Sequence, residues 1–370
     1  MANSSVSNES FADNKSGEYT GKKLRVAIIG CGGISATHMN AYKNIPLVEI
    51  VAAVDIKPER LTWIKETYGV KKLYSDWNVM LKEIKPDAVD ICTPNGVHMA
   101  PALDAAAAGC HIFVEKPMAM NPDQCKKMIA AAKANNVKLA VGFQHRFNVY
   151  TDYLVRARDE GKFGNIMFVK CQALRRRGIP NWGVFGRKEL QGGGPLIDIG
   201  VHVIEMAHFF MGEPKPVAAS GNTWTYLGDK KSDVVSCWPN WDYKTYNVED
   251  LAIGHIRFDN GAIMQIEASF AAHIEKDLWT FSAMGDKGGC SWDPSMIFSD
   301  EAGSMVNSHP VFIGDTSWDY LFKTKLTKWV RACLFDEPLQ ASGESGLAVQ
   351  KILDAVYRSA AQGGKEVAID

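Results

Sequence analysis

The residues best suited to chemistry stand in two short segments, Glu115-Lys116-Pro117 and Gly192 to His202. Lys116 follows an apolar, strand-like segment. Its ammonium group could hydrogen-bond a reacting hydroxyl and stabilise the negative charge that develops on the oxygen. Pro117 restricts the backbone of the preceding lysine to extended conformations. From the tripeptide alone, a solvated lysine at the end of a strand is an equally good interpretation.

The second segment carries Asp198 and His202, four residues apart in an otherwise apolar helical pattern. That spacing places both side chains on one face of a helix. A carboxylate there is unfavourable unless it is paired or faces a cavity. An Asp beside a His can orient the imidazole and raise its basicity, and His accepts a proton readily near neutral pH. A buried structural Asp–His pair is the alternative. The three glycines at 192–194 favour a ligand, because they permit its close approach.

A glycine-rich turn near the beginning of the chain could hold a cofactor for this chemistry. The segment LRVAIIGCGG, residues 24–33, predicts a buried strand and a turn, and a helix follows from Ile34. Gly30, Gly32 and Gly33 would let the backbone approach a pyrophosphate, which the N–H groups of the helix, that of Ile34 among them, would bind. Asp55 ends the next apolar strand and could bind ribose hydroxyls. A tight turn with a helix cap is the alternative.

Strands and helices alternate from residue 24 to residue 143. This rhythm predicts an α/β domain with a doubly wound parallel sheet, whose ligands lie at the carboxyl ends of the strands. We therefore predict a dinucleotide-binding domain over residues 22–145 and a substrate-binding and oligomerisation domain over residues 146–370. Further strand ends carry candidate cofactor contacts at Thr93, Pro94, Asn95 and His98, and candidate substrate contacts at His145 and Arg146. His98 could equally be only the first residue of a helix.

Beyond residue 145 the pattern changes to strand-like segments separated by turn residues, among them Asp259-Asn260-Gly261. This predicts an α/β domain with a large open, mostly antiparallel sheet. Within it, Arg177, Asn181 and Trp182 could line a sugar pocket, although a basic segment is more commonly a solvated or oligomer-facing surface. An open sheet leaves a face to cover, which favours a homodimer or homotetramer.

Composition excludes several classes of function. The chain has 370 residues and a net charge of −1, which gives no electrostatic case for nucleic acid or an anionic membrane. No apolar segment reaches the about 18 residues that a transmembrane helix needs. Residues 1–21 are polar and are expected to form a flexible tail instead of a secretory signal. Eight cysteines without a CxxC pair indicate free thiols in a reducing cytoplasm, and no metal site is predicted.

The glycine turn, the EKP tripeptide and the segment GGGPLIDIGVH together resemble the Gfo/Idh/MocA family, named after glucose–fructose oxidoreductase, inositol dehydrogenase and a rhizopine-catabolism protein. The resemblance covers about residues 22–362, with Ser35 as a mild departure in the glycine pattern. It implies a nicotinamide-binding Rossmann domain followed by an open-sheet domain. It also implies that Lys116 contacts substrate and cofactor, as Glu115 beside it would contact the cofactor. His202 would be the acid/base, and Asp198 would position the substrate and the imidazole.

We therefore expect an NAD-dependent oxidoreductase that acts on a secondary hydroxyl of a sugar, glycoside or cyclic polyol, such as C3 of a glucoside or anhydrosugar. Asp55 favours NAD, and Lys57 leaves NADP open. Inositol oxidation is the alternative substrate class. A non-catalytic dinucleotide-binding regulator and a glycosidase that cycles hydride through a bound cofactor are alternatives of other classes.

Overall fold

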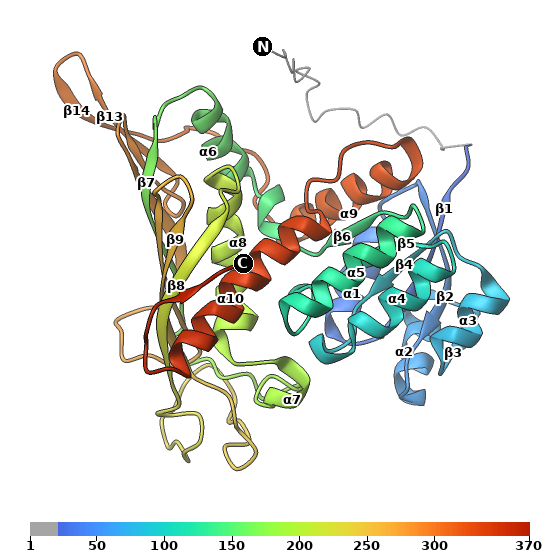
Figure 1. Ribbon diagram of the computed structural model, residues 1–370. Coiled ribbons are helices and arrows are strands. Elements are labelled where there is room, and N and C mark those ends of the chain that lie inside the picture. Colours follow the sequence, from blue (N-terminus) through green and yellow to red (C-terminus); the bar gives the residue numbers. More distant parts are fainter. Residues whose placement is uncertain (1–20) are drawn as a thin grey trace.

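The computed structural model describes residues 21–370, which form two sheets with helices packed against them (Figure 1). The first sheet is parallel throughout, with strand order β3-β2-β1-β4-β5-β6. Its strands are β1 Leu24–Ile29, β2 Val48–Val54, β3 Leu73–Tyr74, β4 Ala88–Ile91, β5 His111–Val114 and β6 Leu139–Val141. The predicted doubly wound sheet is confirmed. The predicted tail, apart from Gly21, lies outside the described residues.

Helices join successive strands of this sheet: α1 Gly33–Tyr42, α2 Pro58–Tyr68, α3 Trp77–Ile84, α4 Met99–Ala107 and α5 Pro122–Ala134. Local sequence explains where several begin. Pro58 and Pro122 occupy first-turn positions, and the side chains of Asp76 and Asn121 accept hydrogen bonds from the N–H groups of α3 and α5. The strand order reverses between β1 and β4. Sheets of this type bind ligands at that point.

The second sheet has nine strands in the order β14-β13-β12-β11-β7-β10-β9-β8-β15. Only β7 and β10 pair in parallel, so the expected mostly antiparallel sheet is confirmed. The strands are β7 Ile166–Leu174, β8 Pro216–Trp224, β9 Leu251–Phe258, β10 Ile263–Ser269, β11 Leu278–Gly285, β12 Gly289–Ser291, β13 Met296–Glu301, β14 Ser304–Ser308 and β15 Val367–Ala368. The turn at Asp259-Asn260-Gly261 joins β9 to β10, as predicted.

Helices cover one face of the nine-stranded sheet. They include α6 Val149–Asp159, α8 Val201–Phe210 and α10 Gly343–Ala360, and Figure 1 shows α8 and α10 between this sheet and the first domain. Along β9 and β10, buried residues alternate with more exposed ones. One face of the sheet is therefore buried against these helices. Within residues 21–370, no helix packs on the opposite face.

The last part of the chain returns to the first domain. Helix α9, Trp318–Phe335, packs against α1. Its residues Phe322, Leu326, Trp329 and Val330 belong to the same buried cluster as Val26 and other residues of β1. Helix α10 contacts both α5 and β8. The core of the first domain therefore includes helix α9, which lies almost 300 residues after β1 in the sequence.

Some elements differ from expectation. The helical pattern that carries Asp198 and His202 is not one regular α-helix: it begins with a π-helical turn over Leu196–Gly200 and continues as α8. Such turns are frequent at functional sites. The short helix α7 (Lys188–Gln191) and the strands β12 to β15 were not predicted, because they are short and lack a long alternating pattern. None of the helices in residues 21–370 is long and apolar enough to cross a membrane.

Candidate active site

The glycine turn lies at the reversal of the first sheet. Gly30 has φ +93°, and a Cβ there would lie 2.8 Å from backbone atoms of Cys92 and Thr93 at the end of β4. Only glycine satisfies both constraints. By contrast, a Cβ on Gly32 or Gly33 would meet nothing within 4 Å. No side chain caps the N-terminus of α1. The first turn of α1, which includes half-buried Ile34, therefore offers unpaired N–H groups beside open space.

Asp55 closes this site on the β2 side. Its carboxylate accepts hydrogen bonds from the backbone N–H groups of Cys31 (2.7 Å) and Lys57 (2.8 Å). These bonds fix the carboxylate next to the glycine turn and leave it further acceptor capacity. Arg60 donates to the carbonyls of Cys31 and Gly32, which ties α2 to the same turn.

The segment after β4 is anchored in two directions. The His98 ring lies 2.9 Å from the carbonyl oxygens of both Thr93 and Pro117, so it links the segment after β4 to the one after β5. Asn95, which follows Pro94 in a 3₁₀ turn, donates to the carbonyl of Gln191 in the second domain. The buried hydroxyl of Thr93 has no partner among the described residues. It fits a ligand contact, whereas His98 and Asn95 hold the backbone in place.

Lys116 and Asp198 meet between the two domains. The Lys116 ammonium donates to the Asp198 carboxylate (3.0 Å) and to its backbone carbonyl (2.7 Å), and both side chains are largely buried. The two segments that carry the candidate catalytic residues therefore lie together in the fold. The expected partner of Asp198 was His202, whereas the observed partner is Lys116. Within residues 21–370 no hydrogen bond joins Asp198 to His202. Asp198 therefore orients Lys116 directly.

His202 lies in a largely aromatic environment. Its ring centroid is 5.2 Å from that of His145 and 5.6 Å from that of Trp279. Burial, with the nearby charge of Lys116, holds the pKa of His202 well below the ordinary value of 6.5. Burial and Lys116 likewise lower the pKa of His145 to about 4. Both imidazoles are therefore neutral at pH 7, and His202 can accept a proton.

Glu115 faces the interior. Its carboxylate lies 2.8 Å from the Lys325 ammonium of α9 and 3.0 Å from His38 Nε2 of α1, and it accepts a hydrogen bond from the backbone N–H of Lys116. Burial opposes its ionisation, but Lys325 and His38 hold the pKa of Glu115 far below its usual value. We predicted that the Glu115 carboxylate contacts a cofactor. In the structure its partners are instead Lys325, His38 and the backbone N–H of Lys116.

The network continues through His38 to Asp90 (2.8 Å) and from Asp90 to the Tyr42 hydroxyl (2.9 Å). Burial alone would lower the pKa of His38, but Asp90 and Glu115 on either side outweigh it and raise that pKa. The raised pKa favours the protonated form of His38, which together with Lys325 offsets the charge of the two carboxylates. A buried network is stable only when its charges are paired in this way.

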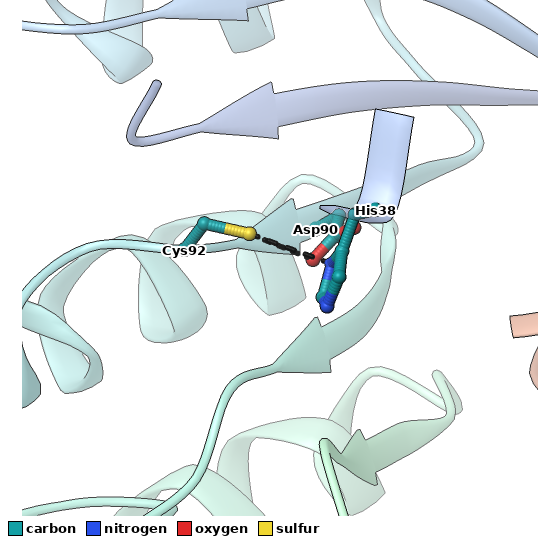
Figure 2. A group of neighbouring side chains, drawn as sticks. All are labelled: His38, Asp90 and Cys92. Atoms are coloured by element: carbon teal, nitrogen blue, oxygen red, sulfur yellow. Dashed lines mark hydrogen bonds and ion pairs between the residues drawn. The ribbon is translucent and has the colours of Figure 1, made fainter. Parts of the chain in front are cut away.

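Figure 2 shows His38, Asp90 and Cys92, whose potential ligand atoms lie close enough together to hold a metal ion. The donor set does not fit one. His38 Nδ1 is bonded to Asp90, the Lys325 ammonium lies 3.2 Å from His38 Nε2, and burial raises the pKa of the Cys92 thiol well above 9. Metals bind the thiolate, which these surroundings disfavour. We interpret the group as part of the hydrogen-bonded network.

The prediction that Arg146 binds substrate is wrong. Its buried guanidinium forms ion pairs with Glu205 and Glu213 and donates to the carbonyl of Gln340. A charged group this deeply buried requires such partners, and they are distant in sequence. The ring of the neighbouring His145, in contrast, lies beside that of His202, and its contact with a substrate stays a prediction.

The other predicted substrate residues lie on the segment after β7. Arg177 donates to backbone carbonyls and its guanidinium lies 3.1 Å from His273. Asn181 is exposed, and Trp182 is stacked on Trp238. Their contact with a substrate stays a prediction.

Sequence reasoning missed two residues around the site, Trp279 and Lys325. Trp279 contacts the rings of both His145 and His202 from β11. Lys325 reaches Glu115 across 210 residues of sequence. The available signal was the position of Lys325 three residues after Phe322 and four before Trp329, on the apolar face of a helix, because a buried lysine requires a partner.

The network predicts a large stability effect for Lys325→Met, which keeps the side-chain length and removes the charge. Loss of the ammonium leaves Glu115 buried with too little positive charge, so we expect the free energy of unfolding to fall by about 3–5 kcal/mol. Denaturant unfolding measures it, with Lys323→Met, an exposed lysine on the same helix, as the control. Equal stability of the two variants would contradict the assignment.

Comparisons with known proteins agree with this geometry. Residues 24–143 match the model of the oxidoreductase family with an NAD-binding Rossmann fold, and residues 152–291 match the GFO/IDH/MocA C-terminal domain. The chain is 36% identical to D-glucoside 3-dehydrogenase of Escherichia coli, over 93% of this chain and 97% of that protein. It is 31% identical to levoglucosan dehydrogenase of Pseudarthrobacter phenanthrenivorans, over 76% and 74%.

Among solved structures, that of a levoglucosan dehydrogenase in complex with NADH superposes with a TM-score of 0.83 at 24% identity, covering 94% of this chain and 100% of the other. At that identity the likeness establishes the fold. The two family models and the relative that matches nearly end to end establish the family, as the resemblance predicted. The chain therefore belongs to the Gfo/Idh/MocA family of NAD-binding oxidoreductases.

Proposed function

We propose that this protein is an NAD-dependent dehydrogenase that oxidises a secondary hydroxyl of a sugar, with C3 of a glucoside as the first candidate. The single observation that carries the proposal is the contact of Lys116 with Asp198 between the two domains, close enough to neutral His202 for the charge of Lys116 to lower its pKa. The similarity to a D-glucoside 3-dehydrogenase and to a levoglucosan dehydrogenase supports the substrate class.

Lys116 is suited to bind the reacting hydroxyl. A lysine ammonium has three N–H donors, and Asp198 accepts from two of them, through its carboxylate and its carbonyl. The third donor is left for the substrate oxygen. As that oxygen loses its proton, the positive charge of Lys116 stabilises it, and the fixed position of the ammonium avoids a cost of reorganisation.

His202 is suited to take the proton. Its ring forms no hydrogen bond within residues 21–370, and its lowered pKa keeps it in the neutral, accepting form. NAD, when bound, would accept a hydride from the carbon that carries the reacting hydroxyl. The proton of that hydroxyl passes to His202. Loss of the hydride and of the proton together converts the alcohol to a ketone.

The residues around the glycine turn are suited to NAD. The open N-terminus of α1 and the glycine turn would receive the pyrophosphate, Thr93 would contact the cofactor through its unpartnered hydroxyl, and Asp55 would bind the ribose hydroxyls. A 2′-phosphate at that ribose would meet the Asp55 carboxylate, which disfavours NADP.

The open face of the nine-stranded sheet is suited to self-association. Phe168 on β7 lies beside Ile263 on β10 and Met284 on β11, all on the face without a helix. We propose a cytoplasmic homodimer or homotetramer that covers this face. The eight cysteines, which form no disulfide within the described residues, are consistent with a reducing compartment.

Removal of the catalytic groups tests the mechanism. We expect His202→Gln and Lys116→Met each to lower kcat by about 10²-fold or more, because each removes a group that acts on the reacting hydroxyl. Reduction of NAD is followed against glucosides, anhydrosugars, free sugars and inositols, and NADH binding is followed by fluorescence. Unchanged turnover in either variant would refute the mechanism. Activity with inositols alone would show that the substrate is an inositol and not a sugar.

The pH profile gives a second test. Because the pKa of His202 lies well below 6.5, the base is deprotonated at neutral pH, and the rate of oxidation should fall only when the pH drops well below 6.5. Lys116→Met removes a positive charge near His202, so in any residual activity the acidic limb should move to higher pH. A limb at or above pH 6.5 in the wild type would contradict the assignment.

Cofactor preference tests the role of Asp55. We expect the wild type to prefer NAD to NADP, and Asp55→Ser to reduce the ratio of the two kcat/KM values by about tenfold or more, because a charged acceptor for the ribose is lost. The matched control is Glu59→Gln, an exposed carboxylate in the first turn of α2. A ratio that Asp55→Ser leaves unchanged would remove Asp55 from the cofactor site.

The oligomer is tested by light scattering. The wild type should have the mass of a dimer or tetramer, and Met284→Lys should shift it toward the monomer with little loss of secondary structure, because a charge would be buried at the interface. A monomeric wild type would refute the proposal.

A further inference from the structure

Two tryptophans stack near the active site and are absent from the mechanism above. The ring centroids of Trp182 and Trp238 are 5.5 Å apart with an interplanar angle of 12°. Trp182 is nevertheless 52% exposed. A stacked pair of indole rings with one exposed ring presents a flat apolar surface on which an aromatic ligand could stack. Its place in the fold indicates what would bind there.

The loop that carries Trp182 leads from the end of β7 to the segment that holds Asp198. It starts after β7 at Arg175, and it ends at the glycines 192–194, directly before the π-helical turn that holds Asp198. At its far end, Gln191 accepts the hydrogen bond from Asn95 at the cofactor site. Trp182 therefore lies on a loop whose far end adjoins both Asp198 and the cofactor site.

Arg175 joins the tryptophans to the centre of the site. Trp279, whose ring contacts His202, pairs in register with Ala173 on β7. Arg175 lies two residues further on, and the hydrogen bond from its N–H to the carbonyl of Ser269 continues the ladder between β7 and β10. Alternate residues of a strand share a face, so Arg175 lies on the same face as Trp279, toward His202.

The guanidinium of Arg175 in turn lies 4.6 Å from the ring centroid of Trp238. A Cβ on Gly178 would be 3.0 Å from the Trp238 ring and 2.5 Å from the Arg175 side chain. The absence of a side chain at Gly178 thus permits this close contact. The order from the buried centre outward is His202, Arg175, Trp238 and Trp182.

The second tryptophan comes from a different segment, the long connection between β8 and β9. Two hydrogen bonds, both formed by Asn247, join that connection to the Trp182 loop. The N–H of Asn247 donates to the carbonyl of Gly186 (3.0 Å), and the Asn247 side chain accepts from the N–H of Lys188 (2.7 Å). Two loops held together in this way present one aromatic surface.

We propose that Trp182 and Trp238 form a subsite for an apolar, preferably aromatic, aglycone of a glucoside whose sugar ring occupies the site at Lys116 and His202. The inference rests on the proposed function. A sugar alone would fill the polar centre, whereas the substituent on its anomeric carbon would extend outward. An aromatic substituent gains stacking energy against indole rings, and a methyl substituent gains little.

The test compares glucose, methyl β-D-glucoside and phenyl β-D-glucoside. In the wild type, kcat/KM should be highest for the phenyl glucoside. Trp182→Ala and Trp238→Ala should each lower kcat/KM for the phenyl glucoside by about tenfold, mainly through KM, and change the value for glucose less than about twofold. Trp238→Phe, which keeps an aromatic ring, should restore most of the loss.

The matched control is Phe335→Ala, because Phe335 is also a half-exposed ring beneath an arginine, Arg331, but lies at the end of α9. Equal losses for all three compounds, or no loss for the phenyl glucoside, would overturn the subsite.

Calorimetry on the NADH-loaded protein separates this inference from the proposed function. If Trp238→Ala weakens binding of the phenyl glucoside and not of the methyl glucoside, the subsite is supported even in a protein that oxidises neither compound. If the wild type oxidises glucosides but the tryptophan variants bind both compounds normally, the proposed function stands and the subsite is refuted.

Discussion

The contact between Lys116 and Asp198 is the interaction on which the rest of the site depends. One residue lies just beyond the end of β5 in the first domain, and the other lies in a π-helical turn of the second. Neither domain alone can build the site, since the ammonium and its two acceptors come from opposite sides. The hydrogen bond from Asn95 to Gln191 joins the same two domains a short distance away. The relative placement of the domains is therefore part of the catalytic geometry.

Beneath this contact lies a second layer of charges. Glu115 supports the Lys116 backbone and is itself held by Lys325 and His38. The arrangement resembles other preorganised sites, in which groups that touch the substrate are fixed by groups that do not. It also explains why an ionised carboxylate can exist at the centre of the first domain: its neighbours include an ammonium and an imidazole whose pKa is raised.

Much of this was predictable from local sequence. The glycine turn, the alternation of strands and helices, and the position of Lys116 just after β5 follow from patterns within about 30 residues. The partner of Asp198 was not predictable, because the spacing of Asp198 and His202 suggested a pair, whereas the ammonium that binds Asp198 comes from a different domain. Arg146 and Lys325 show the same difficulty. Each is a charged residue whose position is set by partners far away in the sequence, and no local pattern distinguishes a buried ion pair from a substrate contact.

The return of α9 to the first domain has a consequence for synthesis of the chain. Phe322, Leu326 and Trp329 complete a core whose other members are made near the beginning. While the ribosome makes the intervening residues, α9 does not yet cover the apolar surface of α1 and β1. Glu115 and His38 also lack their ion-pair partner Lys325 at this stage. The N-terminal domain therefore cannot finish folding as an independent unit during translation. We expect it to depend on a late, long-range closure, the kind of step that exposes nascent chains to chaperones and to aggregation.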